Sequence, residues 1–202
     1  MANTLTTIVP EPTPAVLDSI IVGLNGFHYE RLRCLDRLDF RDVQRTVRRE
    51  LPKVTASRLV QGVVNLKRYY AGLLLDPLNL HVVPAPVAVF LRAHILSSRD
   101  YQAFSEAVFG EYVHHEPLID ESPTVTATAR QIYKDTLTLQ RNLFGATDSR
   151  WWPRQDRHLL YHPEVTDPLI RSKALFPARQ RRLFKSATKK KRARDRRKRG
   201  YL

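Results

Sequence analysis

The positive charge of this chain is concentrated at one end. Of its 34 Lys and Arg residues, 15 lie within residues 171–202, together with one of its 20 acidic residues. Residues 1–170 therefore hold 19 basic and 19 acidic residues and are formally neutral, although the chain as a whole carries a net charge of +14. A segment so rich in like charges and so poor in apolar residues cannot bury enough surface to fold alone. The hydrophobic core must come from the residues before it.

Helical periodicity dominates those earlier residues. Apolar residues recur at the 3.6-residue spacing of helices, the chain has only seven glycines, and strand-like alternation is hard to find. We therefore predict an all-α protein, a compact bundle of five to six helices with an extended C-terminal arm and a basic tail. Caps and stop signals place the helices at about residues 14–25, 39–51, 55–75, 87–96, 100–109 and 124–144.

The helical pattern ends at Pro153, which divides the chain into three parts. Residues 1–153 form the predicted helical domain. Residues 154–178 contain three prolines and no sustained period, and we expect an extended arm that lies on a surface. Residues 179–202 are the basic tail.

Several classes of protein are excluded by composition. A single cysteine, Cys34, rules out an internal disulfide and a cysteine-based zinc site. The first residues lack the charged and apolar regions of a secretory signal. No apolar run approaches the roughly 20 residues that span a bilayer, so we expect a soluble protein without a membrane partner.

The basic tail carries the strongest chemical signal. Dense clusters of Lys and Arg attract nucleic-acid phosphates by releasing counterions, independently of base sequence, and the arginine fork suits phosphate geometry. A solubility tail or a nuclear-import signal would have a similar composition. The side chains that we expect to bind nucleic acid or an acidic partner are Arg181, Arg182, Lys185, Lys189, Lys190, Lys191, Arg192, Arg194, Arg196, Arg197, Lys198 and Arg199.

Three motifs in the helical part occur in a characteristic order. The chain reads VAVFLRAHIL at residues 87–96, FGEYVHHEP at residues 109–117, and Phe-Gly followed by Trp-Pro between residues 144 and 153. Over about residues 55–153 this order resembles the helical domain of the glycine-rich-domain-containing proteins of plants and bacteria. The resemblance implies a helical fold. The glycine-rich region of that family is absent, and Ala88, Leu91 and Arg92 stand where the family carries Asp, Trp and His.

Three histidines remain in these motifs, and they admit two interpretations. His94, His114 and His115, with His81 or Glu116, would supply enough ligands for a zinc site. Adjacent histidines at a helix end more often bond free backbone carbonyls, and the HH pair alone lacks the spacing of known metal motifs. We expect no cofactor and no enzymatic activity, since the sequence contains no known catalytic motif. A metal-dependent enzyme built on the three histidines is an alternative.

Two adjacent tryptophans mark the end of the helical part. Trp151 and Trp152 either clamp the departing arm onto the domain or contact a neighbouring chain. The clamp is the simpler interpretation.

These features together predict a non-enzymatic structural or adaptor protein of a large nucleoprotein assembly. The helical domain would pack on other subunits, the tail would reach nucleic acid or an acidic surface, and no small-molecule substrate is indicated. A bacteriophage virion is favoured, because a degenerate motif suits a domain reused as a building part. The location would then be the virion or the host cytoplasm, or the nucleus in a eukaryote. The alternative is a free nucleic-acid-binding or ribosome-associated protein that binds mainly through its tail.

Overall fold

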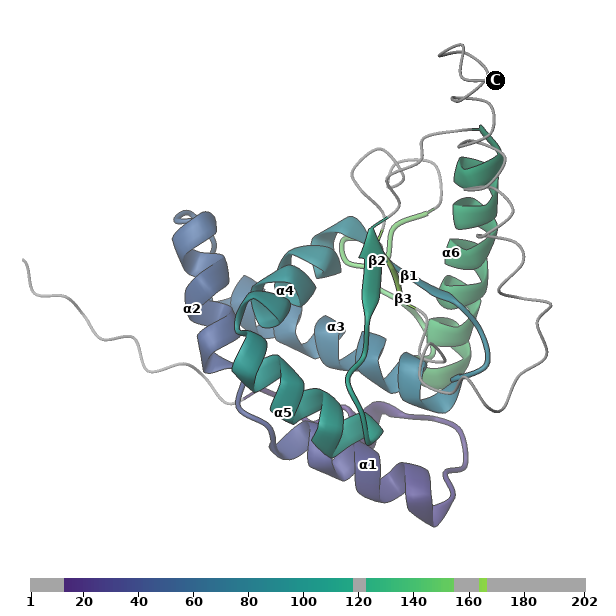
Figure 1. Ribbon diagram of the computed structural model, residues 1–202, viewed down its shortest axis with the longest axis horizontal. Helices are drawn as coiled ribbons and strands as arrows, with labels where there is room; N and C mark the ends of the chain where they lie inside the picture. The colour runs from purple at the N-terminus through teal and green to yellow at the C-terminus, as the bar shows by residue number, and fades with distance from the viewer. Residues whose placement is uncertain (1–12, 118–122, 155–163, 167–202) are drawn as a thin grey trace, which may run out of the picture.

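The computed structural model describes residues 13–117, 123–154 and 164–166 (Figure 1). These residues confirm a mostly helical fold, in which six α-helices are joined by one 3-10 turn and three strands of three residues each. The elements are η1 (Leu17–Ser19), α1 (Gly26–Arg37), α2 (Arg41–Glu50), α3 (Ala56–Leu75), β1 (His81–Val83), α4 (Ala85–Leu96), α5 (Ser98–Phe109), β2 (His115–Pro117), α6 (Pro123–Phe144) and β3 (Glu164–Thr166).

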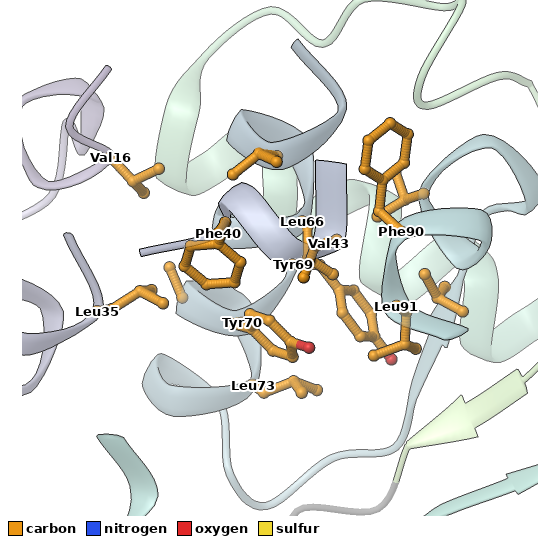
Figure 2. Packing of buried hydrophobic residues seen from close by; sticks show 14 of the residues in the cluster. Val16, Leu35, Phe40, Val43, Leu66, Tyr69, Tyr70, Leu73, Phe90 and Leu91 are labelled. Carbon is orange, nitrogen blue, oxygen red and sulfur yellow. The ribbon is translucent and has the colours of Figure 1, made fainter. Parts of the chain in front are cut away.

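Helix α3 lies at the centre of the bundle. It contacts α1, α2, α4 and α6, so it is covered on several sides (Figure 1). Helical spacing predicts an apolar face on this helix, and its side chains are buried in the main hydrophobic core, several of them drawn in Figure 2. They are Leu59, Val63, Leu66, Tyr70 and Leu73.

Local signals set most of the helix ends. The Thr55 side chain accepts a hydrogen bond from the Arg58 amide at 3.2 Å and starts α3, as the sequence predicts. Gly110 and Gly145 follow α5 and α6 with φ angles of 91° and 72°, a conformation that costs glycine little. Both predicted stops are therefore confirmed.

The predicted first helix, from Pro14 to a stop at Gly26, is wrong. Only a 3-10 turn forms there, because the backbone is extended at Ile20 and the Ile21 amide donates to the Leu143 carbonyl at 2.9 Å instead of continuing a helix. Gly26 is instead the first residue of α1, which Asn25 caps. Val16, Leu17, Ile20 and Leu24 reach the core from this mostly irregular backbone, whereas Ile21 is 68% exposed. Helical spacing alone cannot distinguish such a segment from a helix.

A small antiparallel sheet, which the sequence did not predict, lies beside the bundle. Its order is β1–β3–β2, and Val165 of the central strand pairs with Val82 on one side and Glu116 on the other. Three residues of the proposed arm thus join two segments of the domain. The remainder of residues 155–178 lies outside the described residues. No helix in the described ranges is long and apolar enough to cross a membrane.

Helices α3 and α4 approach each other at Gly62. A Cβ atom built at this position would lie 1.9 Å from Cζ of Phe90, far inside van der Waals contact. Glycine is needed here for space, because the Phe90 ring occupies the volume of a side chain.

We predict that Gly62→Ala lowers the free energy of unfolding by about 1–3 kcal/mol through overpacking, despite the better helix propensity of alanine. Urea denaturation followed by circular dichroism measures it. Gly26→Ala is the matched control, since a Cβ at this helical glycine meets nothing within 4 Å. Equal effects of the two substitutions would contradict the close contact.

Candidate functional site

The twelve tail residues predicted to bind phosphate lie outside the described residues. The site residues that the structure does place are the three histidines and the two tryptophans. For each of these residues, burial and hydrogen bonds show whether its side chain is accessible to a ligand or is engaged in contacts within the fold.

His94 is part of the aromatic core. Its ring is 5% exposed, and its Nδ1 atom lies 2.9 Å from the Tyr70 hydroxyl. The rings of Phe40, Tyr101 and Phe104 pack around it with centroids 4.7 to 5.2 Å away. Burial lowers the pKa of His94 to about 4, so the ring is neutral near pH 7. It is a packing residue with one polar contact.

His115 is held by a different tyrosine. The Tyr101 hydroxyl donates to the Val113 carbonyl at 2.9 Å and also contacts Nε2 of His115. Because a hydroxyl has one proton, Nε2–H of His115 must donate to the Tyr101 oxygen. Burial, with the nearby His114 and His94, lowers the pKa of His115 to about 3. This contact joins α5 to β2.

The predicted metal ligands do not converge. His114 is exposed, with its ring against Tyr112. His81 is buried, and its Nε2 atom lies 2.8 Å from the Asp76 carbonyl oxygen. Within the described ranges, no group of three His, Cys, Asp or Glu side chains is placed to hold a metal ion. The metal alternative for His94, His114 and His115 therefore has no support from their geometry.

Two of the three motif positions noted on α4 are buried. Ala88 and Leu91 are 4% and 0% exposed, so apolar side chains fill the core at both positions. Arg92 is exposed, and its Nε atom lies 3.4 Å from the Ala88 carbonyl oxygen. Ala88 and Leu91 therefore pack within the domain, and Arg92 lies at its surface.

Trp151 and Trp152 belong to the core. Trp152 is 2% exposed, and its indole nitrogen donates to the side-chain oxygen of Asn65 at 2.7 Å. Trp151 packs against the Phe90 ring. Neither buried indole is available to a neighbouring chain, so the interface interpretation is not supported. The Tyr133 hydroxyl donates to the Pro153 carbonyl at 2.8 Å, which fixes the chain against α6 just before the proposed arm begins.

A buried ion pair, which the sequence analysis missed, lies between α1 and α3. Lys67 is 1% exposed, and its Nζ atom lies 3.4 Å from Oδ1 of Asp36 and 3.2 Å from the Asp36 carbonyl oxygen. Burial lowers the pKa of Lys67, and the Asp36 carboxylate opposes that shift. The Lys67 ammonium also lies 5.6 Å from the centre of the Phe40 ring. Sequence separation hides such a pair, since its partners are 31 residues apart.

An open pocket of about 490 Å³ lies at the end of α6. Two guanidinium groups and two hydroxyls give it a polar character suited to an anion, but its open shape encloses little of a ligand. It is lined by Arg141, Gly145, Ala146, Thr147, Ser149, Trp152 and Arg154.

Comparison with protein-family models, curated proteins and solved structures gives no match to this chain. The resemblance to glycine-rich-domain-containing proteins stays a prediction.

The buried state of His94 predicts acid sensitivity. Its folded pKa of about 4 lies below the unfolded value near 6.5, so between these pH values the unfolded chain binds a proton that the folded chain does not. The free energy of unfolding should therefore fall as pH falls from about 6.5 to about 4, by up to about 1.4 kcal/mol per pH unit from this group.

Urea denaturation at several pH values measures this dependence. His94→Gln should make it shallower by about 1 kcal/mol per unit between roughly pH 6 and 4.5, since the titrating group is gone. His28→Gln, at a histidine outside the aromatic core, is the control. A dependence unchanged in His94→Gln would show that His94 is not held neutral by the fold.

Proposed function

We propose that this protein is a non-enzymatic structural or adaptor subunit of a large nucleoprotein assembly. Its helical body contacts protein neighbours, and its tail binds the phosphates of a nucleic acid. The observation that carries this proposal is the separation of charge, with 15 of 34 basic residues in the last 32 positions behind a formally neutral body. A chain of this design has a part that folds and a part that binds polyanions.

The positions of the histidines support the structural part of this proposal. His94 and His115 each bond a tyrosine and have pKa values lowered by burial, so both serve the packing of the domain. A body packed in this way presents a folded surface that neighbours can contact. A bacteriophage virion is the assembly that we favour, on the degenerate motif of α4.

The second candidate is a free nucleic-acid-binding or ribosome-associated protein. The same tail favours it, because counterion release depends on the number of phosphate contacts and not on the rest of the protein. The two candidates differ in whether the body has a stable protein partner.

We predict that the full-length chain binds a generic DNA duplex with a steep salt dependence. The slope of log K against log salt should be close to −0.9 for each phosphate contact, and replacing the twelve tail cations by Gln should remove most of it. Fluorescence anisotropy across a salt series measures both slopes. If the substituted chain keeps the affinity and slope of the wild type, or if neither chain binds, the tail does not bind phosphate and this part of the proposal is wrong.

A further inference from the structure

The formally neutral body is itself polarised. Residues 31–68 contain 11 basic and four acidic residues, whereas residues 69–140 contain four basic and eight acidic residues. The basic stretch covers most of α1, α2 and the first half of α3. The two stretches carry +7 and −4, and three acidic residues within residues 1–30 bring the sum for the body to zero. The net charge therefore conceals a positively charged region of the folded domain.

Four cations lie along the chain where α2 passes into α3. Arg48 and Arg49 lie in the last turn of α2, Lys53 lies in the connecting turn, and Arg58 lies in the first turn of α3. Arg49, Lys53 and Arg58 are exposed and Arg48 is half-buried. We call these four residues the basic corner. Glu50 is the single acidic residue between Asp42 and Asp76.

The start of α2 shows how this protein neutralises surface arginines. Arg41 forms an ion pair with Asp39 at 2.5 Å, and Arg45 forms one with Asp42 at 2.7 Å. The Arg41 guanidinium lowers the pKa of Asp39. Within the described ranges, none of the four side chains of the basic corner forms an ion pair or a hydrogen bond. Their charges are therefore available to an external anion.

Helix stability explains the positions of only some of the cations in the basic corner. Arg48 and Arg49 favour the negative end of the α2 dipole. Arg58 is different, because it lies at the positive end of α3, whose first turn contains no acidic residue. Lys53 and Arg58 add to a local positive potential that a polyanion would relieve.

The basic corner lies apart from the start of the proposed arm. The Tyr133 hydroxyl binds the Pro153 carbonyl, so the arm begins beside α6, and residues Glu164–Thr166 of the arm pair with β1 and β2. In Figure 1, α2 and α6 lie at opposite ends of the described body along its longest axis. The basic corner would therefore bind a polyanion at a site separate from the start of the arm.

We propose that the basic corner, Arg48, Arg49, Lys53 and Arg58, is a second binding surface for the phosphate backbone of a nucleic acid. This inference rests on the proposed function and adds a contact made by the folded domain itself. Four cations within the segment from the end of α2 to the start of α3 supply the positive side chains that contact nucleic-acid phosphates, of which a strand presents one at every nucleotide.

Three quadruple variants of the full-length chain test this second binding surface, and each variant removes four positive charges. The corner variant is Arg48→Gln/Arg49→Gln/Lys53→Gln/Arg58→Gln, and the tail variant is Lys189→Gln/Lys190→Gln/Lys191→Gln/Arg192→Gln. The scattered variant, Arg33→Gln/Arg99→Gln/Arg130→Gln/Lys134→Gln, changes exposed cations elsewhere on the body. Fluorescence anisotropy with a DNA duplex across a salt series gives a slope for each chain.

The corner variant should make the slope of log K against log salt shallower by about 3–4, close to one per lost phosphate contact, and the scattered variant should leave it within about 1 of the wild type. If corner and scattered variants behave alike while the tail variant loses slope, this inference is wrong and the proposed function stands. If no chain binds the duplex, both are wrong. Binding of a polyglutamate peptide but not of the duplex would assign the corner to an acidic protein and overturn the inference.

Thermal melting by circular dichroism checks that each variant folds. If the corner variant does not melt cooperatively, the pairs Arg48→Gln/Arg49→Gln and Lys53→Gln/Arg58→Gln replace it, and each should remove about half of the expected change in slope.

Discussion

The buried pair of Lys67 and Asp36 is the contact on which the N-terminal half of the domain depends. An ammonium group that is 1% exposed needs a compensating anion, since an unpaired buried charge costs several kcal/mol. Asp36 supplies that anion only when α1 packs against α3, and the same carboxylate accepts hydrogen bonds from the amides of Val16 and Leu17. One carboxylate therefore links α1, the segment of the 3-10 turn and α3.

Several other buried polar groups of the body also form hydrogen bonds within the fold. Trp152 bonds Asn65, His94 bonds Tyr70, and His115 bonds Tyr101. These bonds link segments that are 14 to 87 residues apart. These polar groups are bonded within the fold, and the groups that we propose for binding are the cations of the basic corner and of the tail.

Sequence reasoning succeeded where the deciding signal is local. Thr55 begins a helix and Gly110 ends one, because a cap or a left-handed turn depends on a few adjacent residues. It failed at Gly26, where a glycine read as a stop is the start of α1. It also missed Lys67, because no neighbouring residue reveals a partner 31 positions away, and it missed three strands too short to show alternation. The roles assigned to His94 and Trp152 required distances that only the folded chain provides.

The claim that this protein is a subunit of a nucleoprotein assembly is tested most directly by its size in a native extract before and after nuclease treatment. If the body binds protein neighbours, the tagged full-length chain should elute from gel filtration in a large particle both times. Its release by nuclease to the size of the 23.4 kDa monomer would show that nucleic acid alone retained it. That result would contradict the assembly and favour a free nucleic-acid-binding protein.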